Sequence, residues 1–196
     1  MRVGLQTKRK QSANKRQTNE KQTENKKIYM SNATYFVGID PDNQASGVGV
    51  VNKETKQCFA LRFKFSELVD WLSRLKDNYG ENVKVYVEGG WLNKSNWHMR
   101  GAAASPAKAA AMGRNVGMNH QTVLLLVEMC SSIGIPCEVV KPLRKGWSGP
   151  DRKITAEELE HFTGWNRRTN QDARDAALLA WVYAGLPVRV KVWREE

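Results

Sequence analysis

The sequence contains few cysteines and no long apolar run. The three cysteines, Cys58, Cys130 and Cys137, are an odd number, and none belongs to a C-x-x-C pair. Because each lies among apolar neighbours, we interpret them as reduced core thiols in a reducing compartment rather than as a disulfide framework. No stretch approaches the ~20 apolar residues that span a membrane. The N-terminus lacks the apolar segment of a secretory signal, so we expect a cytoplasmic protein that is not secreted and has no membrane partner.

Acidic residues are also in the minority. The chain carries 31 Lys and Arg residues against 20 Asp and Glu, for a formal net charge of +11. This balance suits a polyanionic partner, either nucleic acid or an anionic membrane surface, without choosing between them. Residues 1–30 hold nine basic and two acidic residues, a formal charge of +7, which leaves +4 for the rest.

The basic N-terminal segment has little apolar content, so it cannot form a core. We therefore predict a disordered basic tail over residues 1–33 and one domain over residues 34–196. The tail is either a solubilising arm or an arm that binds phosphates without sequence preference. Met30 is an alternative start, which would make the tail a misread leader.

The first predicted strand ends in a carboxylate. Residues 35–41 are mostly bulky and apolar, and they close with Asp40 followed by Pro41. A turn and a second strand over residues 48–51 complete a hairpin, and the alternating segment 57–65 predicts a third antiparallel strand. A carboxylate at the end of a central strand is costly unless something pairs with it. Asp40 is therefore either a lone structural charge at the end of a strand or part of a functional site.

A second carboxylate ends a later strand. The pattern predicts a helix that is capped by Ser66 and runs to about residue 78, followed by a strand over residues 83–88 that ends in Glu88. A strand–helix–strand crossover is right-handed and makes the two strands parallel. We therefore expect Asp40 and Glu88 to emerge side by side at the edge where open α/β sheets place their sites.

Aromatic and basic residues follow these acids. Trp91 and Trp97 lie among basic residues, and this arrangement suits indole rings that stack on bases while the cations hold phosphates. For Trp97 taken by itself, packing against the domain is the better explanation. After a last strand predicted over residues 136–140, a glycine-containing loop adds a second basic group. The residues that we assign to DNA binding are Trp91, Lys94, Arg100, Arg114, Lys141, Arg144, Lys145 and Lys153.

A long helix is predicted from Ser105, as its cap, to about residue 132. Pro106 occupies the first helical position, which is common for proline. Gly113 and Gly117 are four residues apart and therefore lie on one face, where they would permit a close backbone approach. A shorter helix follows the capping box formed by Thr155 and Glu158.

The final predicted helix begins at Asn170 and runs to about Gly185. Asp172 and Asp175 are three residues apart and lie on one face of it. Acidic residues are common in the first turn of a helix, where the helix dipole stabilises them. This explanation accounts for Asp172 as well as a role in a functional site does. It explains Asp175 less well, because Asp175 lies deeper in a run of alanines.

Taken together, residues 35–186 resemble the RuvC-type Holliday junction resolvases of the ribonuclease H-like superfamily. Asp42 replaces the glycine that is usual after the proline of the opening motif, and the loop 93–105 and the C-terminus depart from the family pattern. The matching segments are Gly38-Ile39-Asp40-Pro41 with Gly47, then Glu88, the helix segment Gly113 to Gly117, and Asp172-Ala173-Arg174-Asp175-Ala176.

This resemblance implies an α/β ribonuclease H-like fold: a five-stranded mixed sheet, with its first three strands antiparallel, flanked by helices. It implies a homodimeric endodeoxyribonuclease of a bacterial or phage-infected cell that cleaves four-way DNA junctions in recombination, repair or phage DNA processing. It places Trp91 at an aromatic position that acts on the junction, and Lys141 and Lys153 near the scissile phosphate. The implied catalytic residues, which would also bind two metal ions per active site, are Asp40, Glu88, Asp172 and Asp175.

The four acids suit hydrolysis of a phosphodiester. Two divalent cations about 3.5–4 Å apart can activate water and stabilise the leaving oxygen. Mg²⁺ prefers carboxylate oxygens and water as ligands, and we expect Mn²⁺ to substitute for it. Zinc is not expected, because His98, His120 and His161 are scattered; we assign them to the surface or the core, with only His98 near the site.

Two other functions remain open from the sequence. An ATPase or sugar kinase of the actin-like superfamily opens with a similar hairpin, but it needs two such domains and a phosphate-binding repeat that this chain cannot supply. A catalytically silent protein that binds DNA structures is the second. The four acids disfavour it, because phosphate binding alone would not favour clustered carboxylates.

Overall fold

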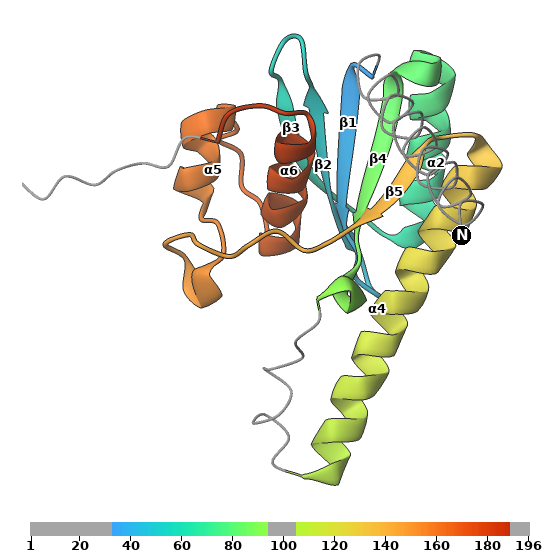
Figure 1. Ribbon diagram of the computed structural model, residues 1–196, viewed down its shortest axis with the longest axis vertical. Coiled ribbons are helices and arrows are strands. Elements are labelled where there is room, and N and C mark those ends of the chain that lie inside the picture. The colour runs from blue at the N-terminus through green and yellow to red at the C-terminus, as the bar shows by residue number, and fades with distance from the viewer. Residues whose placement is uncertain (1–32, 94–104, 189–196) are drawn as a thin grey trace, which may run out of the picture. The chain divides into compact units, whose positions relative to one another are not determined.

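Five strands form one mixed sheet in the computed structural model, which describes residues 33–93 and 105–188. The strands lie side by side in the order β3-β2-β1-β4-β5 (Figure 1). The first three are antiparallel, whereas β4 pairs in parallel with β1, and β5 in parallel with β4. This is the sheet of the ribonuclease H-like fold, so the predicted fold class is confirmed. The strands are β1 (Tyr35–Asp40), β2 (Ser46–Asn52), β3 (Cys58–Phe63), β4 (Val83–Glu88) and β5 (Cys137–Val140).

Helices cover both faces of this sheet. Helices α2 and α4 lie on one face, and α6 lies on the other with α5 beside it (Figure 1). Within the described residues, no helix combines the length and the apolar character needed to cross a membrane. The elements are α2 (Phe65–Tyr79), α4 (Pro106–Ile133), α5 (Ala156–Thr163) and α6 (Gln171–Tyr183), with the short turns η1 (Gly80–Asn82), η2 (Gly90–Leu92) and η3 (Pro150–Arg152).

An apolar cluster fills the space between the sheet and helices α2 and α4. Alternate residues of the central strands, such as Val37 on β1 and Val85 on β4, are fully buried there. They pack against Leu72 of α2 and against Leu126 and Cys130 of α4. The alternation that predicted these strands from the sequence therefore also determines which face of the sheet each side chain occupies.

The other face brings a helix directly onto the strand backbone. A Cβ atom added to Gly38 of β1 or to Gly49 of β2 would collide with the backbone of α6 at Ala176 or Ala177. A Cβ on Gly47 would collide in the same way with the backbone of Asp172. Glycines on the strands and alanines on the helix thus allow α6 to lie closer than side-chain packing would permit, and this fixes the position of its acidic first turns.

Gly49→Ala is therefore expected to lower the free energy of unfolding by about 3 kcal/mol, because the added methyl meets helix backbone that cannot move aside as a side chain can. Chemical denaturation monitored by circular dichroism measures the change. Gly113→Ala is the matched control: a Cβ at that position on α4 has open space around it, and the helix should gain about 0.5–1 kcal/mol. Equal effects of the two substitutions would contradict this account of the α6 contact.

Most helix ends match the sequence signals, with one exception. Ser105, Thr155 and Asn170 each cap a helix through a side-chain oxygen, as predicted. The predicted cap at Ser66 is wrong, because Lys64 is the N-cap of α2. The backbone N–H of Lys64 donates to the carboxylate of Glu67 at 2.9 Å, and the helix therefore begins at Phe65, one residue before the serine.

The predicted close approach at Gly113 and Gly117 is also wrong. No atom of the described residues lies within 4 Å of a Cβ built on either glycine. The first half of α4 extends beyond the end of the sheet (Figure 1), and the buried residues of the helix, Val123, Leu126 and Cys130, all lie in its second half.

Candidate active site

The carboxyl ends of β1 and β4 place two acids on neighbouring strands. The two strands pair in parallel with Ile39 opposite Val87, so Asp40 and Glu88 are the next residues along each. Ile39 is buried among the residues under α2 and α4, and alternation therefore directs Gly38 and Asp40 toward α6. The structure thus brings these two predicted site residues together at one edge of the sheet.

Asp40 occupies an unfavourable environment for a lone carboxylate. Burial raises its pKa well above the ordinary value, and the negative charges of Glu88, Asp175 and Asp172 raise it further. The positive charge of Lys153 acts in the opposite direction. A carboxyl group in this setting gains from a bound cation, because the cation would stabilise the charged form that burial and the other acids disfavour.

Glu88 shares this environment. Burial, followed by the charge of Asp175, raises its pKa to about 6, while Lys153 and Lys145 oppose the increase. Among the described residues, no side chain or backbone group donates a hydrogen bond to the carboxylate of Asp40 or of Glu88. Both carboxylates therefore have oxygen atoms available for an added ligand.

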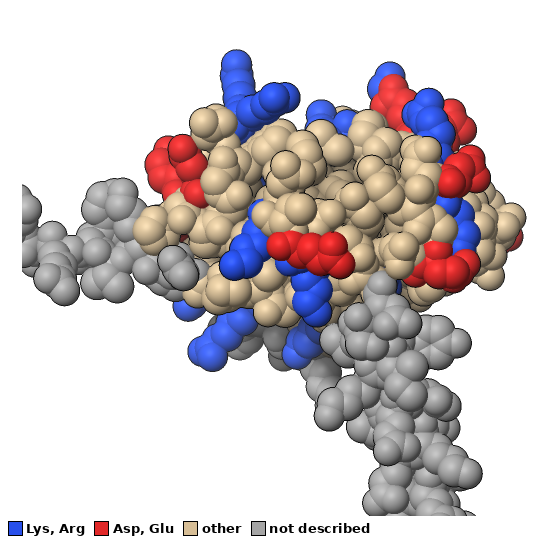
Figure 2. Space-filling view, turned by 90° about the horizontal axis from the view of Figure 1, so that it is seen from above, with Lys and Arg blue, Asp and Glu red and all other residues tan. Residues whose placement is uncertain are grey.

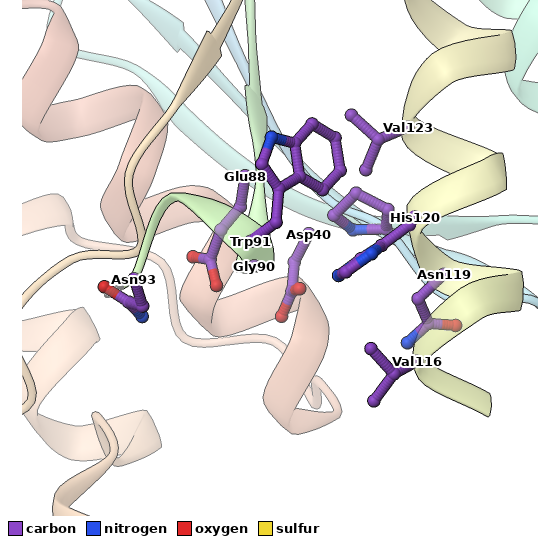
Figure 3. A pocket seen from close by; sticks show the side chains of 10 residues that line it. Asp40, Glu88, Gly90, Trp91, Asn93, Val116, Asn119, His120 and Val123 are labelled. Carbon is purple, nitrogen blue, oxygen red and sulfur yellow. The ribbon is translucent and has the colours of Figure 1, made fainter. Parts of the chain in front are cut away.

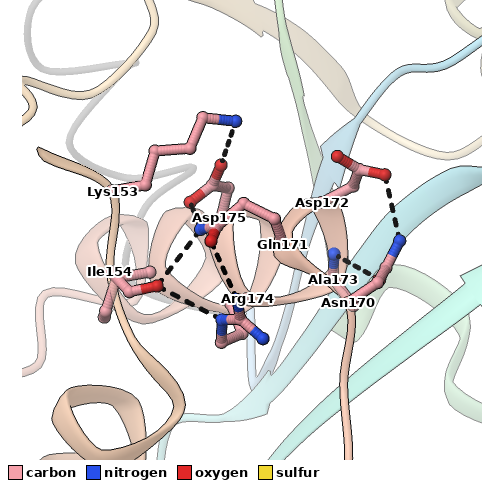
Figure 4. Close-up of polar contacts among 8 residues, drawn as sticks. All are labelled: Lys153, Ile154, Asn170, Gln171, Asp172, Ala173, Arg174 and Asp175. Carbon is pink, nitrogen blue, oxygen red and sulfur yellow. Dashed lines mark hydrogen bonds and ion pairs between the residues drawn. The ribbon is translucent and has the colours of Figure 1, made fainter. Parts of the chain in front are cut away.

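The first turns of α6 carry the other two acids (Figure 4). The amide of Asn170, which caps the helix, donates to the Asp172 carboxylate at 3.0 Å, and that of Gln171 donates to Asp175 at 2.8 Å. Asp172 lies where the helix backbone meets Gly47 of β2. Asp175, one turn deeper, faces the acids of the strands closely enough to raise the pKa of both.

Lys153 supplies positive charge at the centre of this cluster. Its Nζ lies 3.1 Å from a carboxylate oxygen of Asp175. Burial lowers the pKa of Lys153, but the charges of Asp175, Asp40 and Asp172 outweigh burial, so the net shift is upward and the lysine stays protonated. The segment that carries it is fixed to α6, because Gln171 and Arg174 both donate to the carbonyl of Ile154 (Figure 4).

A basic pocket of about 130 Å³ opens beside the acids. Asp40, Glu88 and Asp175 line one side of it, and the loop after β5 lines the other. Four cationic side chains contribute to that loop side, and a tryptophan stands among them. These residues are Arg144, Lys145, Trp147, Arg152 and Lys153.

A second and larger pocket, of about 400 Å³, opens on the other side of the same two strand ends. It lies between the turn η2 and helix α4, and Asp40 and Glu88 line it as well (Figure 3). Trp91, which is 38% exposed, contributes an aromatic wall. Its ring stacks edge to face on His120 of α4, with the ring centroids 4.9 Å apart.

The assignment of His120 to the surface or core, remote from the site, is therefore wrong. His120 lines the same pocket as Asp40 and Glu88, and its Nε2 lies 3.8 Å from the position that a Cβ would take on Gly90. His98, which we had placed near the site, lies outside the described residues, as do Trp97, Lys94 and Arg100. The predicted tail over residues 1–33 lies outside them too, except for its last residue.

The remaining basic residues on which the sequence prediction rested are more scattered. Arg114 lies on the exposed first half of α4, and Lys141 is exposed after β5; neither lines the two pockets. At the far end of the sheet from Asp40, seen from above in Figure 2, Lys and Arg side chains are interspersed with Asp and Glu. The basic side chains that line a pocket with the acids are Arg144, Lys145, Arg152 and Lys153.

The donor set fits a hard divalent cation in its chemistry. Carboxylate oxygens and water are the ligands that Mg²⁺ and Mn²⁺ take, and Asp40 and Glu88 have oxygens free for them. As they stand, however, no three Asp, Glu, His or Cys side chains within the described residues are grouped to hold one ion. Asp172 accepts from Asn170 with one oxygen only, whereas both oxygens of Asp175 have partners, Gln171 and Lys153, with which a metal would compete.

Solved structures with a similar fold include two of RuvC from Thermus thermophilus, each 16% identical to this chain. One, in complex with a Holliday junction substrate, has a TM-score of 0.48 and aligns over 75% of this chain and 90% of that one. The other has a TM-score of 0.47 and aligns over 77% of this chain and 96% of that one. The large terminase nuclease from thermophilic phage G20c is also 16% identical, with a TM-score of 0.31 over 76% and 81%. No family model and no curated protein matches the sequence.

Proposed function

We propose that this protein is a metal-dependent endonuclease that cleaves DNA, with a four-way junction as its substrate. The observation that carries the proposal is the mutual influence of Asp40, Glu88 and Asp175 at one edge of the sheet, with Lys153 beside them. Buried acids that raise one another's pKa are costly to the fold and suit a site that binds cations. The basic pocket next to them suits the phosphate of the substrate.

Each residue has a distinct part in this proposal. Asp40, Glu88, Asp172 and Asp175 hold two Mg²⁺ ions, which supply an activated water and stabilise the leaving oxygen when they are bound. Lys145 and Lys153 hold the phosphate that is cut. Lys153 pairs with Asp175 in the structure, and its Nζ would be available to a phosphate oxygen if that carboxylate bound a metal instead. Figure 3 shows the acids of the strand ends, Asp40 and Glu88, and Figure 4 shows those of α6, Asp172 and Asp175.

The proposal includes a homodimer, because a four-way junction presents two symmetrically related strands. Helix α4 exposes further apolar side chains that suit such a contact, namely Met118, Leu124 and Leu125. Sedimentation equilibrium of the purified protein tests this part separately from activity.

The decisive experiment uses two labelled substrates of the same sequence, a four-way junction and a linear duplex. Each is incubated with the protein with and without Mg²⁺, and the products are separated on a denaturing gel. Cleavage of the junction only when Mg²⁺ is present supports the proposal. Binding of the junction without cleavage under any divalent metal overturns it.

A second candidate, a catalytically silent protein that binds DNA structures, is favoured by one observation. The Lys153–Asp175 ion pair already neutralises part of the acidic cluster, and the acids are not grouped around a metal position. The same gel distinguishes the two candidates, since a silent binder retards the junction and leaves its strands intact.

Trp91→Ala is expected to reduce the preference for a junction over a duplex by about tenfold, because an indole can stack on a base that only the junction exposes, for about 1–3 kcal/mol. Metal binding at Asp40 and Glu88 should persist. Phe59→Ala, which removes another exposed aromatic ring on β3, is the control and should leave the preference unchanged. A lower melting temperature with an unaltered preference would assign Trp91 to packing against His120 alone.

A further inference from the structure

The pocket between η2 and α4 combines flat apolar walls with amide groups. Trp91 and His120 present rings that meet at an interplanar angle of 75°, and Val123 and Val116 of α4 add apolar surface. A volume of about 400 Å³ is within the usual range of small-molecule pockets. Such walls suit a planar ring system better than a flexible chain or an ion.

Polar groups enter this pocket from two directions. Asn119 and His120 come from α4, and Asn93 follows η2 on the opposite side (Figure 3). Within the described residues, neither the Asn93 amide nor the Asn119 amide is held by a side-chain hydrogen bond. A carboxamide has both donors and an acceptor, which allows it to match the edge of a nucleobase.

We propose that this pocket binds one unpaired nucleobase of the strand being cut, and that Asn119 and His120 read its identity. The inference rests on the proposed function, because the base belongs to the nucleotide next to the phosphate held at the acids. Asp40 and Glu88 line this pocket and the basic pocket alike. A nucleotide whose phosphate lies at the acids therefore has its base within reach of the larger pocket.

Base recognition of this kind makes cleavage depend on sequence. Enzymes that accept an unstacked base hold it between aromatic or apolar side chains and hydrogen-bond its edge. Here Trp91 and His120, which contact each other edge to face, form one aromatic wall, Val116 and Val123 add apolar surface, and Asn119 supplies the amide. The turn that carries Trp91 begins at Gly90, which lies next to His120.

The test compares junctions that carry each of the four bases in turn at the nucleotides flanking the branch point. Wild-type cleavage should vary with the base at one position. Asn119→Ala should reduce that preference by about tenfold, since a well-placed amide discriminates at this level. His120→Phe should retain the ring but also weaken the preference. Gln121→Ala, on the exposed side of α4, should behave as wild type. An unchanged preference in Asn119→Ala overturns the proposal.

Fluorescence gives a readout that does not depend on cleavage. A junction with 2-aminopurine at the same position is titrated with Asp40→Asn protein, alone and combined with Asn119→Ala. A change in 2-aminopurine emission that the second substitution reduces supports base capture. Emission that is unaltered on binding overturns it. If the emission changes and wild-type protein cleaves no junction, the base pocket stands and the nuclease proposal fails.

Discussion

Asp40→Asn is expected to abolish cleavage of a four-way junction while leaving junction binding intact. Asp40 is buried, and the charges of Glu88, Asp175 and Asp172 all raise its pKa further. An amide cannot supply the charge that a divalent cation needs, so we expect a loss of roughly a thousandfold or more in rate, or about 4 kcal/mol. Single-turnover cleavage and a gel-shift titration on one preparation measure the two effects.

Asp42→Asn is the matched control for this substitution. Asp42 lies two residues further along, in the turn to β2, where its carboxylate accepts from the backbone N–H groups of Gln44 and Ala45 at 2.8 and 3.3 Å. An asparagine oxygen can accept the same bonds, so the turn and the cleavage rate should both be retained. An Asp40→Asn protein that cuts at the rate of the control would refute the role given to Asp40.

The metal-free protein is expected to lose stability as pH rises from about 4.5 to about 6. The pKa of Glu88 is about 6 in the folded state, against 4.5 for an unperturbed glutamate. The folded state therefore binds the proton more tightly than the unfolded state, and this contribution, present below pH 4.5, is lost as Glu88 ionises. The difference corresponds to about 2 kcal/mol. The raised pKa of Asp40 adds a loss of the same sign.

Glu88→Gln isolates this effect. In EDTA at pH 7.5 the variant should be more stable than wild type by about 2 kcal/mol, and its stability should change less between pH 4.5 and 6. Mg²⁺ should raise the melting temperature of wild type and not that of the variant, because binding to the folded state stabilises it. Glu128→Gln, on the exposed surface of α4, is the control and should follow wild type. A wild type that is more stable than Glu88→Gln without metal would contradict this prediction.

The strands and their two acids could be predicted from the sequence because the signals are local. Period-two alternation identified β1 and β4, and the helix between them fixed their parallel pairing, so the proximity of Asp40 and Glu88 followed from topology alone. The position of Asp175 followed less directly. It depends on alanines of α6 matching glycines of β1 and β2, a complementarity between segments more than a hundred residues apart.

Other parts of the site depend on geometry that residue spacing does not contain. The spacing of Gly113 and Gly117 predicted a shared face, but not that this part of α4 passes beyond the sheet. The position of His120 beside Asp40 and Glu88 was not predicted for the same reason. The periodicity of a helix does not determine where its axis crosses the edge of a sheet. Lys153 was predicted to bind DNA, a role that stays a prediction, and its ion pair with Asp175 was not foreseen because it joins two separate segments.

The uneven burial of α4 has a consequence for its local unfolding. Helix turns near Val123, Leu126 and Cys130 are held by the core, so their amides open only with the domain as a whole. The turns from Pro106 to about Met118 are exposed and rely mainly on their own hydrogen bonds, which are marginal in a helix of that length. Amide hydrogen exchange should accordingly slow by stages along this single helix, from the Pro106 end, which extends beyond the sheet, toward the end next to β5.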